Sequence, residues 1–222
     1  MVNGVVAVVG QKADPEVDSI EIDGIPLPVK PGLVHYLVYK PPGVISSAAD
    51  PQGRPIVTGL VPPEPRVFPV GRLDEASEGL LILTNDGELA NRLTHPRFGV
   101  EKTYTVLVEG LPTPADMRSL CDGVALDDGP AAALRAKVLD RHRHQALLEI
   151  VLGEGRKREV RRMCAAVGHP VTRLVRTAIG PLRDPQLRPG NWRSLTLDEV
   201  RSLYEAGGGL WEDAPPGEEE VP

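Results

Sequence analysis

The chain has 222 residues, enough for one large domain or two small ones that each bury a core. Hydrophobic residues make up 41 % of it, and no stretch reaches the roughly 18 consecutive apolar residues typical of a membrane-spanning helix. Cys121 and Cys164 are too few for a disulfide framework, and the five histidines lack the spacing of metal ligands. We therefore expect a cytosolic protein that binds no metal and no membrane.

Charge is unevenly distributed along the chain. The net charge of −6 argues against a nucleic-acid partner, but residues 204–222 carry six acidic residues and no Lys or Arg. Residues 1–203 are therefore neutral overall. Between Arg135 and Arg176 there are eleven basic residues and four acidic ones, a local net charge of +7. Such a basic sector is typical of a phosphate-binding surface, although a solvated basic face without a ligand is the alternative.

The first 32 residues form a small unit of their own. Residues 5–9 are apolar and residues 19–24 alternate between apolar and polar, which predicts two strands. Residues 26–32 contain three prolines and are interpreted as a linker. The main domain is expected at 33–203, opening with a strand at 33–39, and residues 204–222 are expected to form a disordered acidic tail.

Further elements follow from apolar periodicity and turn residues. Residues 79–84 form a continuous apolar run that predicts a strand buried on both faces, and Asn85–Gly87 can cap the helix that follows. The remaining predictions, in chain order, are a helix at 88–93, a strand at 103–108, a helix at 114–120, paired strands at 131–139 and 145–152, a helix at 156–167, and a last helix that begins with a capping box at Thr196 and Glu199.

Two segments carry candidate chemistry. Asp74 lies in a polar turn directly before the buried strand at 79–84, a usual place for a functional group. The predicted helix at 156–167 has five cations in its first seven positions, where the helix dipole disfavours them. These cations are Arg156, Lys157, Arg158, Arg161 and Arg162. Their position is understandable if a phosphate or a carboxylate lies among them.

Four segments, in this order, resemble the RsuA-type ribosomal RNA pseudouridine synthases. They are Lys40–Gly43, the run from Gly71 to Gly87, Glu101–Tyr104 and the segment from Glu154 to Met163. The resemblance implies an α+β fold whose central sheet is mixed and largely antiparallel, with helices packed on it. The N-terminal unit resembles the second half of the RNA-binding fold of ribosomal protein S-four, without its two basic helices. We therefore expect that Met1 is an internal methionine or a truncation point.

The resemblance also implies a function and a role for each site residue. The enzyme would isomerise a uridine of ribosomal RNA, with a preference for the large subunit, as a monomer and without a cofactor. Asp74 would be the nucleophile, paired with Arg161, and Tyr104 would pack on the flipped base. Arg72 would fill the space that the base leaves, and the remaining RNA contacts would be Lys40, Lys102, Arg156, Lys157, Arg158 and Arg162.

Two other functions remain open from the sequence. A non-catalytic RNA-binding or ribosome-assembly factor would share the basic segment but would not explain why Asp74, Tyr104 and Arg161 occur together. A glycoside hydrolase would use Asp74 with Glu75 or Glu78, because such enzymes need two carboxyl groups at one bond. Nothing in the sequence marks a second acid with a raised pKa. Sugar-binding sites are usually rich in aromatic residues, which are only 4 % of this chain.

Overall fold

The computed structural model describes residues 1–14, 18–22, 25–26 and 32–208. Its strands are β1 (Glu21–Ile22), β2 (Ile25–Pro26), β3 (His35–Lys40), β4 (Phe68–Val70), β5 (Glu78–Thr84), β6 (Lys102–Glu109), β7 (Val124–Leu126), β8 (Gly129–Ala131), β9 (Arg135–His142), β10 (Gln145–Leu152), β11 (Val171–Ile179), β12 (Leu182–Arg183) and β13 (Trp192–Ser194). Its α-helices are α1 (Gly87–Thr94), α2 (Pro114–Asp122), α3 (Glu159–Ala166) and α4 (Leu197–Ala206), and two short 3-10 helices are η1 (Val57–Leu60) and η2 (Pro96–Phe98).

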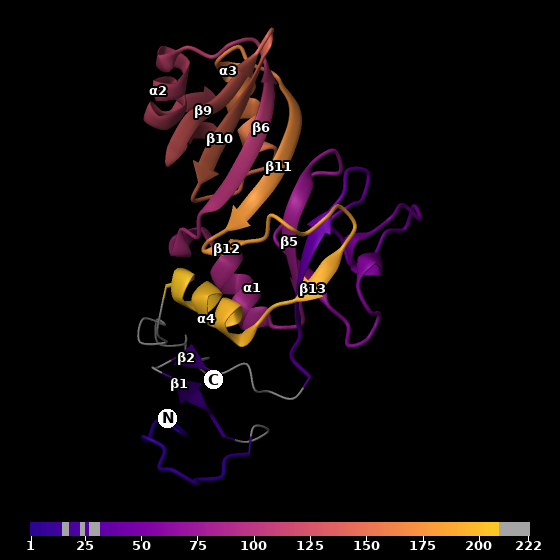
Figure 1. Ribbon diagram of the computed structural model, residues 1–222, viewed down its shortest axis with the longest axis vertical. Helices are drawn as coiled ribbons and strands as arrows, with labels where there is room; N and C mark the ends of the chain where they lie inside the picture. Colours follow the sequence, from indigo (N-terminus) through magenta and orange to yellow (C-terminus); the bar gives the residue numbers. More distant parts are fainter. Residues whose placement is uncertain (15–17, 23–24, 27–31, 209–222) are drawn as a thin grey trace, which may run out of the picture.

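A nine-stranded mixed sheet organises the molecule (Figure 1). Its strand order is β13-β3-β5-β11-β6-β10-β9, with β4 beside β5 and β12 beside β11. Strands β5 and β11 pair in parallel through only two residue pairs, whereas the other neighbours in this sheet are antiparallel. The α+β class with a mixed, largely antiparallel sheet is therefore confirmed. We call β11, β6, β10 and β9 the first half-sheet and β13, β3, β5 and β4 the second half-sheet.

Strand β5 is buried along its whole length, because the second half-sheet is covered on both faces. Leu80 and Ile82 pack into a cluster with side chains of α1 and α4. Leu81 and Leu83 point the other way and pack with apolar side chains from residues 44–67. The continuous apolar run in the sequence thus reflects burial on two sides, as expected of an interior strand.

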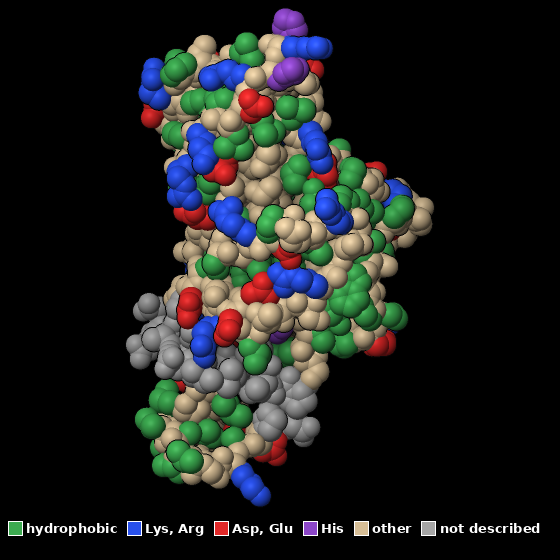
Figure 2. Space-filling model, viewed as in Figure 1, with side chains coloured by type: hydrophobic (Ala, Val, Ile, Leu, Met, Phe, Trp, Pro, Cys, Tyr) green, Lys and Arg blue, Asp and Glu red, His purple; other side chains and the backbone are tan. Residues whose placement is uncertain are grey.

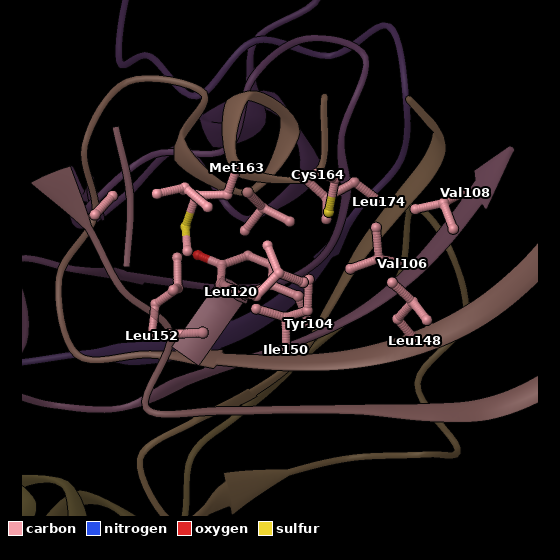
Figure 3. Close-up of a cluster of buried hydrophobic side chains, with 14 of the residues drawn as sticks. Tyr104, Val106, Val108, Leu120, Leu148, Ile150, Leu152, Met163, Cys164 and Leu174 are labelled. Atoms are coloured by element: carbon pink, nitrogen blue, oxygen red, sulfur yellow. The ribbon is translucent and has the colours of Figure 1, made fainter. Parts of the chain in front are cut away.

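The first half-sheet has its own core, formed against α2 and α3 (Figure 3). Val106, Val108, Leu148 and Ile150 come from β6 and β10 and are at most 1 % exposed. Helix α3 contributes Val160, Met163 and Cys164 at helical spacing, as the sequence predicted.

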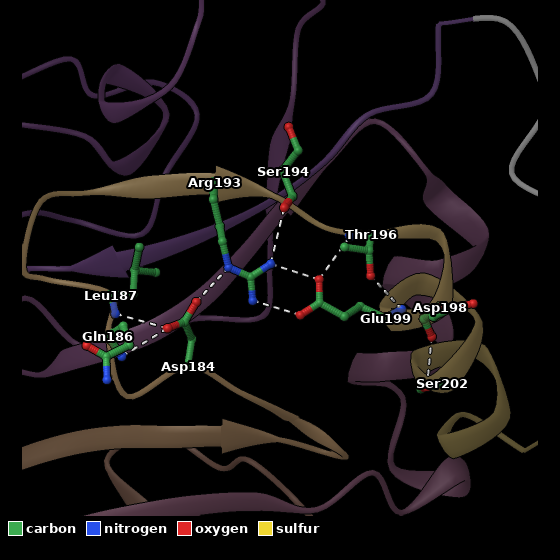
Figure 4. Close-up of polar contacts among 9 residues, drawn as sticks. All are labelled: Asp184, Gln186, Leu187, Arg193, Ser194, Thr196, Asp198, Glu199 and Ser202. Carbon is green, nitrogen blue, oxygen red and sulfur yellow. Dashed lines mark hydrogen bonds and ion pairs between the residues drawn. The ribbon is translucent and has the colours of Figure 1, made fainter.

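Several helix ends agree with the capping residues that the sequence indicated. Helix α1 begins at Gly87, and the carboxylate of Asp86 accepts hydrogen bonds from the backbone N–H groups of Glu88 and Leu89 at 3.1 Å. A capping box of Thr196 and Glu199 begins α4. Arg193 on β13 then donates to Glu199 and to Asp184, which joins the edge of the sheet to the start of α4 (Figure 4).

Three sequence predictions need correction in the described residues. Residues 5–9 form no strand; Val5, Val6, Val8 and Val9 are exposed, and only Val5 is bridged, to Val2. The folded part does not end at residue 203, because α4 continues to Ala206 and Tyr204 is buried, with its hydroxyl donating to Asp86 at 2.7 Å. Most of the expected linker at 26–32, and the tail beyond residue 208, lie outside the described residues.

The third correction concerns the basic segment. Helix α3 begins at Glu159 and not at residue 156. Arg158 adopts a left-handed conformation with φ of 51°, and the backbone N–H of Arg156 is capped by the Glu159 carboxylate at 2.9 Å. The first three cations therefore lie in a turn before the helix, where the helix dipole constrains them less.

Candidate active site

A cavity of about 450 Å³ lies where the two half-sheets meet. Six parts of the chain line it: residues 70–77, the end of α1, strands β6 and β11, the end of β10, and residues 155–160. Most of the residues singled out from the sequence reach it, namely Arg72, Asp74, Lys102, Tyr104, Arg156, Lys157 and Arg158. Lys40, Arg161 and Arg162 are absent from its lining. The structure thus joins segments that are far apart in the chain.

Asp74 stands in a turn that is fixed from several sides. The turn closes with a hydrogen bond from the Ser77 backbone N–H to the Asp74 carbonyl at 2.9 Å. The Ser46 hydroxyl accepts from the Leu73 N–H at 3.0 Å and donates to the Leu73 carbonyl at 2.9 Å. The Leu73 side chain is buried in the core of the first half-sheet. These contacts hold the Asp74 side chain, which is 32 % exposed, at the cavity wall.

Lys40 has a different position from the one predicted. Its side chain is fully buried, and its ammonium group donates to the carbonyls of Pro41, Glu75 and Ser77 at 2.9, 3.3 and 2.7 Å. Burial lowers the pKa of Lys40 to about 8, and the nearby carboxylates oppose that lowering. This position does not favour the predicted RNA contact, because the charge of Lys40 is used to hold the turn that carries Asp74.

Arg161 also supports this turn. Its guanidinium donates to the Ala76 carbonyl at 3.2 Å, to the Ser77 hydroxyl at 3.3 Å and to the Val171 carbonyl at 3.2 Å. Within the part of the chain that the structure describes, no direct ion pair joins Arg161 to Asp74. The nearest cation to the Asp74 carboxylate is Arg158, at 3.9 Å. Arg158 is thus the direct ion-pair partner of Asp74, whereas Arg161 holds the turn and is influenced by the Asp74 charge, which opposes the lowering of the Arg161 pKa by burial.

Two of the expected phosphate ligands are occupied by partners within the protein. Arg162 forms a two-pronged ion pair with Asp128, at 2.6 and 2.9 Å. Arg156 donates to Glu154 at 3.1 Å and to the Gly129 carbonyl at 3.3 Å. Acidic side chains also lie among the basic ones on the face seen in Figure 2, so the local charge of +7 does not form a uniform patch there.

Tyr104 lies at the boundary between the core and the cavity. The residue is only 8 % exposed, and its side chain packs in the core of the first half-sheet (Figure 3). Tyr104 also lines the cavity. Lys102, two residues earlier on β6, is on the same face of the sheet. Burial and, to a smaller extent, the nearby Arg176 lower the pKa of Lys102 to about 8.

Sequence reasoning missed two charged residues of the cavity. Arg176, on β11, is 4 % exposed and lies in register with Tyr104. Glu159 is 3 % exposed, and burial raises its pKa to about 7. Strand β11 itself was not predicted, because residues 171–179 do not alternate between apolar and polar side chains. No signal in this segment of the sequence therefore marked Arg176 as buried.

The carboxyl groups suggested for a hydrolase do not meet in the cavity. Glu75 and Glu78 are both absent from its lining. Glu78 is bonded to Arg173 at 2.8 Å, and this bond lowers the pKa of Glu78. Glu78 is therefore an ionised partner in a structural pair, whereas a glycosidase acid needs a raised pKa.

The described residues contain no cluster of three or more His, Cys, Asp or Glu side chains that could hold a metal. None of the helices in the same part of the chain has the length and hydrophobicity that a membrane crossing needs. The cavity has several cations around two carboxylates, Asp74 and Glu159. This charge pattern suits a ligand that carries negative charge.

Comparison with known proteins decides the family. Residues 34–166 match the model of the RNA pseudouridylate synthase family. The chain belongs to this family. The "Ribosomal large subunit pseudouridine synthase B" of Bacillus subtilis is 42 % identical over 189 residues, which are 84 % of this chain and 77 % of that protein. The "Ribosomal large subunit pseudouridine synthase E" of Xanthomonas campestris is 44 % identical, over 77 % of this chain and 98 % of that protein.

A solved structure supports the same conclusion. The crystal structure of a pseudouridylate synthase superposes with a TM-score of 0.70 at 28 % identity, covering 91 % of this chain and 87 % of that chain. The RsuA-type resemblance is therefore confirmed, and the chain is an RNA pseudouridine synthase. Enzymes of this family convert uridine in RNA to its isomer pseudouridine, in which the ribose is joined to carbon 5 of uracil.

Proposed function

We propose that this pseudouridine synthase modifies a uridine of large-subunit ribosomal RNA, with Asp74 as the nucleophile. The observation that supports the role of Asp74 is its position: its partly exposed carboxylate lines a cavity that also holds Tyr104 and the exposed cations Arg72, Lys157 and Arg158. The named relatives from Bacillus subtilis and Xanthomonas campestris are large-subunit enzymes, which supports that choice of RNA.

The reaction is an isomerisation and needs no cofactor for its atom balance. The bond between C1′ of the ribose and N1 of uracil breaks, and the carboxylate of Asp74 takes the sugar carbon. After the base turns, C5 attacks C1′ and displaces the carboxylate. The proton on C5 is lost, and N1 gains one from solvent. Arg158 lies 3.9 Å from the Asp74 carboxylate and pairs with the nucleophile.

The uridine must leave its helix before it can reach Asp74. A cavity of about 450 Å³ is within the range of small-molecule sites, and base flipping costs a few kcal/mol, which the protein must recover. Arg72 lies at the edge of the same cavity and is exposed, so it can occupy the gap left in the RNA. The exposed Lys157 and Arg158 are placed to bind the flanking phosphates.

The test uses transcripts of large- and small-subunit ribosomal RNA that carry tritium on C5 of uridine. The wild-type protein is expected to release tritium from the large-subunit transcript, at most one equivalent per modified site. Asp74→Asn is expected to abolish release while the dissociation constant for the RNA stays within about tenfold. Binding without release by the wild-type protein would favour the non-catalytic RNA-binding factor, and release from the small-subunit transcript alone would contradict the choice of subunit.

A further inference from the structure

Arg176 is a buried cation that the proposed chemistry has not yet used. Its Nε donates to the Leu80 carbonyl at 2.7 Å, which anchors the side chain to β5. Its Nη2 is buried and has no hydrogen-bond partner. Among the described residues, no acidic side chain forms an ion pair with Arg176. A buried guanidinium without a counter-charge is unfavourable, because buried charges are normally paired.

Lys102 adds a second cation beside Arg176. Burial is the main cause of the lowered pKa of Lys102, and repulsion by Arg176 is the second cause. The nearest carboxylate that favours the charged form of Lys102 is Glu159, whose own pKa is raised to about 7 by burial. No hydrogen bond to the Lys102 ammonium is found in the described part of the chain. The protein therefore keeps two adjacent cations with little internal compensation.

The depth of these cations indicates which part of a nucleotide they meet. The exposed cations of the cavity, Arg72, Lys157 and Arg158, are at its mouth, where the RNA backbone must stay. Arg176 is buried and is in register with Tyr104, and Lys102 is on the same strand two residues away. A flipped base enters deeper than its phosphates. Lys102 and Arg176 therefore face the base.

We propose that Lys102 and Arg176 bind the carbonyl oxygens of the flipped uracil and stabilise the uracil anion that forms when the glycosidic bond breaks. This inference rests on the proposed function. When the bond from C1′ to N1 breaks, its electron pair stays on uracil and spreads onto O2 and O4. Two cations that hold these oxygens stabilise that charge more than they stabilise neutral uridine, and this difference lowers the barrier.

The same contacts favour uracil over cytosine. Lysine and arginine side chains are donors only. The O4 of uracil accepts a hydrogen bond, whereas cytosine presents an amino group at that position and would leave a donor facing a donor. The two donor side chains therefore select uracil through the same contacts that stabilise the uracil anion.

The experiment compares Lys102→Met, Arg176→Gln and Arg176→Lys with the wild-type protein. Single-turnover tritium release at saturating large-subunit transcript measures the chemical step, and binding of the same RNA over a series of KCl concentrations measures its affinity and salt dependence. Lys102→Met is the safest variant, because no hydrogen bond found in the described residues is lost. Arg176→Gln also removes the bond to Leu80, so thermal melting checks its folding.

Lys102→Met and Arg176→Gln are each expected to slow the saturated single-turnover rate by about 100-fold or more, with the dissociation constant changed less than about threefold. The saturated single-turnover rate of Arg176→Lys is expected to be at least about tenfold higher than that of Arg176→Gln, because lysine restores the positive charge. An unchanged saturated rate for Lys102→Met would overturn the proposal. So would weaker binding with a salt slope flatter by about one, which marks a phosphate contact. No release by the wild-type protein would overturn both this proposal and the proposed function.

Discussion

Replacing Lys40 by methionine tests whether the turn of Asp74 depends on a buried charge. The side chain is fully buried, and its ammonium donates to three carbonyls within 3.3 Å. Hydrogen bonds from a charged donor contribute about 2 kcal/mol each, so their loss costs about 6 kcal/mol. The lowering of the pKa to about 8 is the net result of burial and of the nearby carboxylates that oppose it, and it corresponds to about 3 kcal/mol against the charged form, which methionine would relieve. The expected net loss of stability is therefore about 3 kcal/mol.

For a domain of this size, that loss corresponds to a melting temperature lower by roughly 6–12 °C. The Asp74 turn would also lose its internal donor, and a shift of the nucleophile of about 1 Å can cost about 100-fold in rate. RNA affinity should stay within about threefold, because Lys40 is not accessible to the RNA. Urea unfolding, single-turnover tritium release and RNA binding measure these three quantities on one preparation.

Lys137→Met is the matched control. Lys137 is 61 % exposed and forms a surface ion pair with Glu149, so its loss should cost no more than about 1 kcal/mol. If Lys40→Met melted like the wild-type protein but bound RNA more weakly, with a flatter salt slope, Lys40 would be a phosphate contact. The reasoning from its buried position would then be refuted.

Three further changes test other parts of the structure. Gly79→Ala should destabilise the protein by more than about 3 kcal/mol in urea unfolding, because an added Cβ would lie 2.3 Å from the backbone of β11 and φ is +113°; wild-type stability would contradict the close strand contact. Arg158→Ala should flatten the salt dependence of RNA binding by about one unit, whereas Arg162→Ala should not, because its guanidinium is held within the protein; equal slopes would contradict this difference. The pKa of Glu159 is raised in the folded state to about 7, so the wild-type protein should lose stability as the pH rises from about 4.5 to 7, and Glu159→Gln should remove that loss; parallel stability curves would show that Glu159 is ionised throughout.

Local signals in the sequence predicted much of the fold. Asp86, Thr196 and Glu199 cap their helices as expected, since caps depend on residues only a few positions apart. The apolar run at the centre of β5 also sufficed, because a strand segment buried on both faces is apolar at consecutive positions. The α3 boundary was misplaced by three residues, since the left-handed Arg158 leaves no mark in the hydrophobic periodicity.

The partners within the site could not be predicted in the same way. The motif that contains Arg161 indicated the right neighbourhood, but which atoms it meets depends on the distant turn at Ala76 and Ser77. Arg162 looked like a free phosphate ligand because its partner Asp128 is 34 residues away. The burial of Lys40 was missed for a similar reason: the sequence shows a cation in a turn, but burial depends on what folds over it.

The joint between the half-sheets has a consequence for how the enzyme responds to its substrate. Strands β5 and β11 share only two residue pairs, and each half-sheet has a core of its own, although the end of β11 also contributes Ile179 to the core beside α1 and α4. Local opening should therefore be cheapest at this joint. An RNA nucleotide bound in the cavity would contact both half-sheets and would therefore stabilise the joint between them. Bound RNA should slow amide exchange most along β5 and β11, including positions that the RNA itself never reaches.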